Sequence, residues 1–121
     1  MGEVDTIFAL ATPPGRSALA VFRISGPTAV EALARITRGG GVRPRRPSLR
    51  SLYAATAEKI DDAVVTVFPG PASFTGEDCV ELSVHGSRSV ISALNATLAR
   101  IGGLRVAEPG EFTKRAFLNG R

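Results

Sequence analysis

Two charged side chains interrupt otherwise apolar stretches of the sequence, Arg23 within residues 18–25 and Glu81 within residues 79–84. In each stretch the apolar residues alternate with others, which is typical of a β-strand with one buried face. If the opposite face meets solvent, the two charges need no function. If both faces are covered, the charges must pair with each other or bind a ligand. An arginine fork and a carboxylate that face one cavity could recognise an organic molecule with both acceptor and donor groups. The residues alone leave these alternatives open.

Few other groups in the chain could do chemistry. The single histidine, His85, ends an apolar stretch and is expected to be a hydrogen-bonded structural residue. The single cysteine, Cys79, is expected to be buried in a strand, and one histidine with one cysteine is too little for a zinc site. Neither Ser73 nor Ser87 has a legible histidine–acid arrangement, and there is no GxxxxGK[ST] loop. The sequence therefore predicts no catalytic residue, no metal site and no P-loop nucleotide site in this chain.

The strands that must position Arg23 and Glu81 follow from apolar spacing and from turn residues. Strands are predicted at residues 6–11, 18–25, 51–60, 63–68, 79–84 and 104–107. Asp61 and Asp62 separate two of these stretches and predict a hairpin turn. The polar segments TPPGR, FPGPASFTGED and EPGEF lie at strand ends and could converge into a pocket.

Three helices complete the predicted order of elements. The first begins after Pro27, and the second begins after Ser87 as N-cap and ends before Gly102. The third is a short helix within residues 109–120. This order predicts an α+β fold, with a mixed β-sheet of about five to six strands and two to three helices mainly on one side.

Residues 38–50 form a segment that is rich in arginine and contains no acidic residue. Its arginines are Arg38, Arg43, Arg45, Arg46 and Arg50. Glycines and prolines separate them, and this composition predicts a mobile basic loop. A solvated linker is favoured over an RNA-contacting loop, because no aromatic residues lie between the arginines for bases to stack on.

Length and composition limit the class of protein. With 121 residues the chain predicts one domain, residues 1–121, with a modest core. No apolar run is long enough to cross a bilayer and no secretory signal is recognisable, so a soluble, cytoplasmic protein without a membrane partner is expected. The formal net charge of +4 permits a nucleic-acid partner without requiring one.

Three long blocks of the sequence are DTIFALATPPGRSALAVFRISGP, FPGPASFTGEDCVELSVHGS and RVAEPGEFTKRAFLNGR. In order and spacing they closely resemble the N-terminal domains of the tRNA modification GTPases called MnmE or TrmE. The resemblance implies a fold similar to the tetrahydrofolate-binding domains of glycine-cleavage T-protein and dimethylglycine oxidase. It also implies a homodimer and a bound tetrahydrofolate derivative, such as 5-formyltetrahydrofolate or 5,10-methylenetetrahydrofolate. By the family's motifs, the folate contacts fall on Arg23, Glu81 and Arg121.

Members of this family continue into a helical domain, a Ras-like GTPase domain that uses GTP with magnesium and potassium, and a C-terminal cysteine motif. With the FAD-dependent partner MnmG (GidA), they modify carbon 5 of the wobble uridine of certain tRNAs, with the folate as one-carbon donor. None of those further motifs occurs in this chain, so it is expected to be the N-terminal domain and not to be catalytic alone. Two other hypotheses remain: a structural dimerisation module in which Arg23 and Glu81 merely pair, and a tRNA-contacting module that uses the basic segment.

Overall fold

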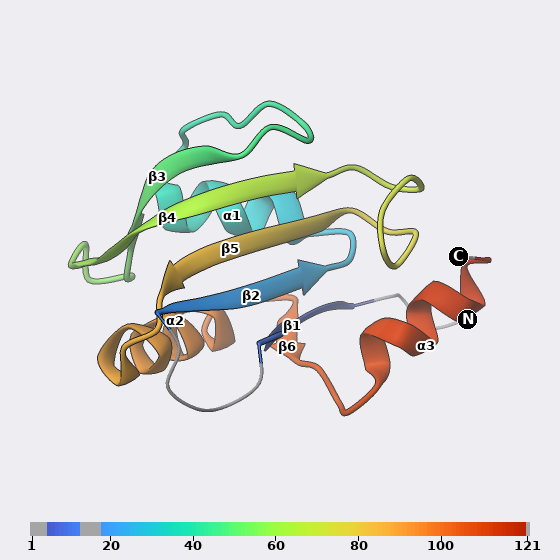
Figure 1. Ribbon diagram of the computed structural model, residues 1–121. Coiled ribbons are helices and arrows are strands. Elements are labelled where there is room, and N and C mark those ends of the chain that lie inside the picture. Colours follow the sequence, from blue (N-terminus) through green and yellow to red (C-terminus); the bar gives the residue numbers. More distant parts are fainter. Residues whose placement is uncertain (1–4, 13–17, 121) are drawn as a thin grey trace.

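The computed structural model describes residues 5–12 and 18–120. Along the chain lie β1 (Thr6–Leu10), β2 (Leu19–Ser25), α1 (Ala29–Thr37), β3 (Ser48–Tyr53), β4 (Lys59–Phe68), β5 (Cys79–His85), α2 (Arg88–Ala99), β6 (Leu104–Val106) and α3 (Glu111–Leu118) (Figure 1). The strands form one six-stranded sheet in the order β3-β4-β5-β2-β1-β6. The β1–β6 pair is parallel and the other neighbours are antiparallel. The predicted α+β fold with a mixed sheet is therefore confirmed.

Helices α1 and α2 cover one face of the sheet. Phe22 of β2 and Leu82 of β5 are fully buried there, in one cluster with Ile36 of α1 and Leu98 of α2. Because side chains alternate along a strand, Arg23 and Glu81 must lie on the other face. Helix α3 lies apart from the other two, beyond β1 and β6 (Figure 1). The sheet thus has one covered face and one more open face.

The second helix begins as the sequence predicts. The Ser87 side chain accepts a hydrogen bond from the backbone N–H of Val90 at 3.3 Å, which satisfies one of the free donors at the helix start.

None of the helices in the described ranges is long and apolar enough to span a bilayer.

The predicted hairpin turn at Asp61 and Asp62 is wrong, because both residues lie inside β4. The turn lies at residues 54–58, where the backbone N–H of Ala54 donates to the carbonyl of Glu58 and Ala57 has a φ of 76°. Strand β3 accordingly begins three residues earlier than predicted, at Ser48.

Partners for both carboxylates explain why they are tolerated in a strand. Asp61 accepts hydrogen bonds from the backbone N–H of His85 at 2.8 Å, and its carboxylate lies 2.9 Å from Nδ1 of that residue. Burial opposes ionisation of Asp61, but these hydrogen bonds hold its pKa below the usual range. Asp62 accepts from Ser51 at 2.7 Å and pairs with Lys59 at 2.9 Å. Local turn propensity was therefore overridden by these partners, of which Ser51 and His85 come from other strands.

Candidate ligand site on the open face of the sheet

Arg23 and Glu81 are direct neighbours across the β2–β5 ladder. Nη2 and Nε of Arg23 donate to the same oxygen of Glu81, Oε2, at 3.0 and 3.3 Å. The side chains remain 25% and 34% exposed, so water still reaches both groups. An ion pair this accessible contributes little to stability, on the order of 0–1 kcal/mol. The structure therefore shows the pairing that was one of the alternatives, in a position where a ligand can still reach it.

A cleft of about 390 Å³ opens beside the guanidinium of Arg23. Residues 9–11, 107–110 and 112–113 line it together with Arg23 and Phe74. The guanidinium carbon lies 4.9 Å from the ring centre of Phe74 and 5.8 Å from that of Phe112, within the range of cation–π attraction. A mostly apolar cleft of this size that also carries charged groups, here Arg23 and Glu108, is typical of small-molecule sites.

The cleft is built by segments that are distant in sequence. Ala9 of β1 is the register partner of Arg23, while residues 107–113 connect β6 to α3 and Phe74 comes from the loop between β4 and β5. The segments FPGPASFTGED and EPGEF thus do converge, as predicted. The TPPGR turn and Arg121 lie outside the described residues.

Glu81 does not itself line the cleft. It lies on β5, the neighbour of β2 away from β1, so Arg23 stands between Glu81 and the cleft. Its second oxygen, Oε1, accepts no hydrogen bond from a described residue. A ligand that occupies the cleft could therefore contact Arg23 directly and could reach Glu81 by displacing or bridging the guanidinium.

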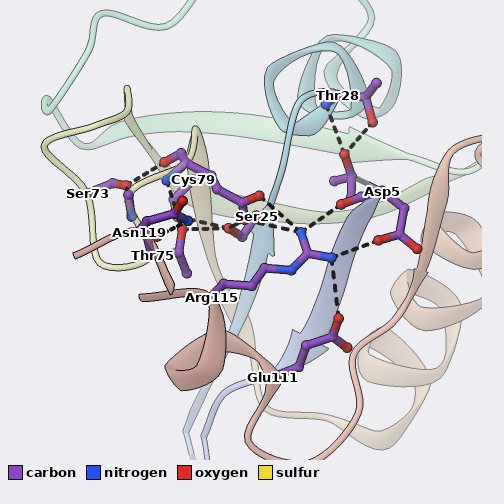
Figure 2. Close-up of polar contacts among 12 residues, drawn as sticks. Asp5, Ser25, Thr28, Ser73, Thr75, Cys79, Glu111, Arg115 and Asn119 are labelled. Atoms are coloured by element: carbon purple, nitrogen blue, oxygen red, sulfur yellow. Dashed lines mark hydrogen bonds and ion pairs between the residues drawn. The ribbon is translucent and has the colours of Figure 1, made fainter. Parts of the chain in front are cut away.

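A buried arginine in α3 was missed by sequence reasoning. The Arg115 side chain is only 10% exposed and forms ion pairs with Asp5 at 2.7 Å, Glu77 at 3.2 Å and Glu111 at 3.3 Å. Figure 2 shows Arg115 pointing from α3 toward Asp5 and Glu111. The four-residue spacing of Glu111 and Arg115 was the available signal, but Asp5 and Glu77 could not be paired with them from sequence.

These ion pairs alter the ionisation of their members. Burial lowers the pKa of Arg115, but its contacts with Glu77 and Asp5 more than offset this and raise it. A hydrogen bond from Arg105 is the main reason why the pKa of Glu111 falls to about 2. Glu111 and Arg115 are therefore both charged at neutral pH.

The same cluster fixes the loop that contributes Phe74. Ser25 of β2 donates to Glu77 at 2.7 Å and lies 2.7 Å from the hydroxyl of Thr75, which is 3.0 Å from the buried thiol of Cys79. Asn119, after α3, donates to the carbonyl of Thr75 at 2.9 Å (Figure 2). Loop and helix are thereby joined, which sets the positions of the two phenylalanines that line the cleft, Phe74 and Phe112. Cys79 is buried, as predicted.

A family model described as "GTP-binding protein TrmE N-terminus" matches residues 6–121. Similar curated proteins include the tRNA modification GTPase MnmE of Phenylobacterium zucineum, which is 56% identical over 97% of this chain and 26% of its own length. Those of Dinoroseobacter shibae and Anaplasma marginale are 52% and 50% identical, over 98% and 100% of this chain and 27% of their own lengths. The chain thus spans about a quarter of the length of these relatives.

Proposed function

The chain belongs to the family of the N-terminal part of the GTP-binding protein TrmE, and we propose that it is the folate-binding domain of a tRNA modification GTPase. The observation that supports this most is the cleft in which the Arg23 guanidinium lies near the rings of Phe74 and Phe112, with the Glu81 carboxylate behind it. Planar walls, a cation and the carboxylate of Glu81 suit a pterin with an anionic tail.

The residues present fit a reduced folate by their chemistry. Glu81 would accept hydrogen bonds from the amino group and ring N–H of the pterin, for which its unused Oε1 is available. Arg23, and Arg121 by family resemblance, would contact carbonyl or carboxylate oxygens. Phe74 and Phe112 would cover the faces of the ligand. When bound, 5-formyltetrahydrofolate or 5,10-methylenetetrahydrofolate would supply a one-carbon unit.

The rest of the proposal concerns the whole protein. As a homodimer with the FAD-dependent partner MnmG, in the cytoplasm, it would modify carbon 5 of the wobble uridine of tRNA. GTP, with magnesium and potassium, would bind in a region that the longer relatives have and this chain does not cover. The functions proposed for this chain are folate binding and dimerisation.

Isothermal titration calorimetry of the chain with 5-formyltetrahydrofolate tests the proposal. We expect saturable binding, which Glu81→Ala weakens by about one to two orders of magnitude, because a charge-assisted hydrogen bond contributes roughly 1.5–3 kcal/mol. Glu58→Ala is the matched control, since Glu58 is an exposed acid in the turn between β3 and β4. Unchanged affinity in a folded Glu81→Ala variant would remove Glu81 from the site.

The competing hypothesis is a purely structural module, and the ion pair between Arg23 and Glu81 is the observation that favours it. Under that hypothesis the wild-type chain gives no heat with a reduced folate. The double variant Arg23→Met with Glu81→Leu would then stay folded and keep its oligomeric state.

A further inference from the structure

We propose that the basic segment, residues 38–50, is a contact surface for the phosphodiester backbone of a nucleic acid, which is RNA if the proposed function holds. Its five arginines are Arg38, Arg43, Arg45, Arg46 and Arg50, and it contains no acidic residue. Only the choice of RNA rests on the proposed function. The binding surface itself is argued from charge and geometry.

Within the described ranges, the arginines of this segment lack carboxylate partners, as Arg88 and Arg100 of α2 also do, but here five such arginines lie within 13 residues. Arg23, Arg105 and Arg115 each form an ion pair with an acid. Among the described residues, no carboxylate pairs with any of the five arginines of the basic segment. Their positive charge is therefore available to a partner.

The segment is also held in shape, in contrast to the mobile loop expected from composition. The backbone N–H of Arg45 donates to Val67 of β4 at 2.8 Å, and Arg50 donates through Nη2 to the carbonyl of Gly41 at 2.7 Å. Val42 packs against the core. The guanidinium of Arg38 lies 4.6 Å from the ring centre of Tyr53. The segment is therefore already ordered before a partner binds, which reduces the entropic cost of binding.

Two arginines of this segment, Arg43 and Arg46, are the most accessible to a phosphate group. Both are exposed, and their side chains donate to no described residue. Arginine offers a planar fork of donors that matches phosphate oxygens. Contacts of this kind bind the backbone without reading bases, which agrees with the scarcity of aromatic residues in the segment.

A nucleic acid fits this surface better than a protein does. The cores of protein–protein interfaces use arginine together with exposed aromatic residues and methionine, and only the other charged residues are depleted there. In residues 38–50, Leu49 is the one large hydrophobic residue that is exposed. Phosphates, in contrast, are bound mainly by exposed cations through release of counterions.

The basic segment contacts the loop that contributes to the ligand cleft. Arg45 donates through Nη2 to the carbonyl of Ala72 at 2.5 Å, two residues before Phe74. Figure 1 shows the segment running along the β4 side of the sheet toward this loop. A nucleic acid on the basic segment would therefore lie next to the loop that forms one wall of the cleft.

Fluorescence anisotropy with a labelled, unmodified tRNA transcript, titrated with the chain at several potassium chloride concentrations, tests the proposal. The variant is Arg43→Gln with Arg46→Gln. The control is Arg88→Gln with Arg100→Gln, which removes two exposed arginines from the ends of α2 and gives the same net charge. Each lost phosphate contact lowers the slope of log affinity against log salt by roughly 0.7–0.9. We expect the slope to fall by roughly 1.4–1.8 in the variant and to stay near the wild-type value in the control.

Circular dichroism melts establish that both variants are folded before they are compared. An equal fall of the salt slope in variant and control would mean that only net charge matters and would overturn the proposal. It would also be overturned if wild type did not bind tRNA at low salt, or if polyglutamate of equal charge competed as well as tRNA. Folate titration of the same variants is a separate measurement, so failure of tRNA binding and failure of the proposed folate site are distinguishable.

Discussion

Arg23 on β2 and Glu81 on β5 face each other across the antiparallel ladder, with 3.0 Å between Nη2 of Arg23 and Oε2 of Glu81. Of these two residues, Arg23 lines the neighbouring cleft and Glu81 does not. Because both side chains are partly exposed, separating them costs little free energy. A ligand with its own donors and acceptors can therefore exchange with this ion pair. The pairing and a binding role are compatible.

Phe74→Ala should weaken binding of 5-formyltetrahydrofolate about tenfold, because an aromatic wall contributes roughly 0.5–1.5 kcal/mol beyond its buried area. Phe74 is 51% exposed, so the melting temperature should change little. Calorimetry and a thermal melt measure the two effects. Phe117→Ala is the control, since Phe117 is 81% exposed and does not line the cleft. Equal losses in the two variants would argue against Phe74 as a wall.

The fold was largely predictable, because strand alternation and helix caps are local signals. Val80, Leu82 and Val84 alternate with Glu81 as a strand with one buried face requires, and the Ser87 cap lies where predicted. The turn between β3 and β4 was not predictable, since the partner of Asp61, His85, comes from another strand.

The candidate site was predictable only in part. Arg23 and Glu81 stand out because a charge within an apolar alternation is unusual. Phe74 and Phe112 do not, since nothing local says that a loop and the start of a helix will meet on one face of a sheet. The contact of Arg115 with Asp5 likewise joins positions 110 residues apart.

Glu111→Gln should reduce the loss of stability in acid. The pKa of Glu111 is lowered from 4.5 to about 2 on folding, mainly by Arg105. Its charge therefore stabilises the fold above about pH 4.5, and this contribution is lost as the pH falls toward about 2. Allowing for solvent screening, it is worth roughly 1–2 kcal/mol. Urea unfolding across this window should give a flatter pH dependence in the variant, whereas Glu108→Gln, at an exposed carboxyl, should follow the wild type.

Arg115→Met should destabilise the domain by about 3 kcal/mol, because it leaves the largely buried carboxylate of Glu77 without an ion-pair partner among the described residues. It also leaves Asp5 and Glu111 with Arg105 alone. Denaturant unfolding at neutral pH measures the effect. Lys114→Met changes the same charge on an exposed neighbouring position and should cost much less. A small effect of Arg115→Met would mean that Arg105 and water compensate the acids in its absence.

Gly26→Ala should destabilise by about 2–4 kcal/mol. Gly26 follows β2 with a φ of 141°, and an added Cβ would lie 2.6 Å from Cα of Thr6. Gly102→Ala is the matched control, because an added Cβ there meets nothing within 4 Å. We expect the control to change the free energy of unfolding by less than about 0.5 kcal/mol. Equal stability of the two variants would show that the β2–α1 turn can relax.

The ion pairs of Arg115 have a consequence for synthesis of the chain. A ribosome adds Arg115 110 positions after Asp5. The ladder between β2 and β5 can form earlier, but the cleft gains its wall at residues 107–113 only once α3 has emerged and packed. A nascent chain therefore cannot retain a ligand in this cleft until α3 is in place, and ligand binding would stabilise chains with a packed α3 over shorter ones.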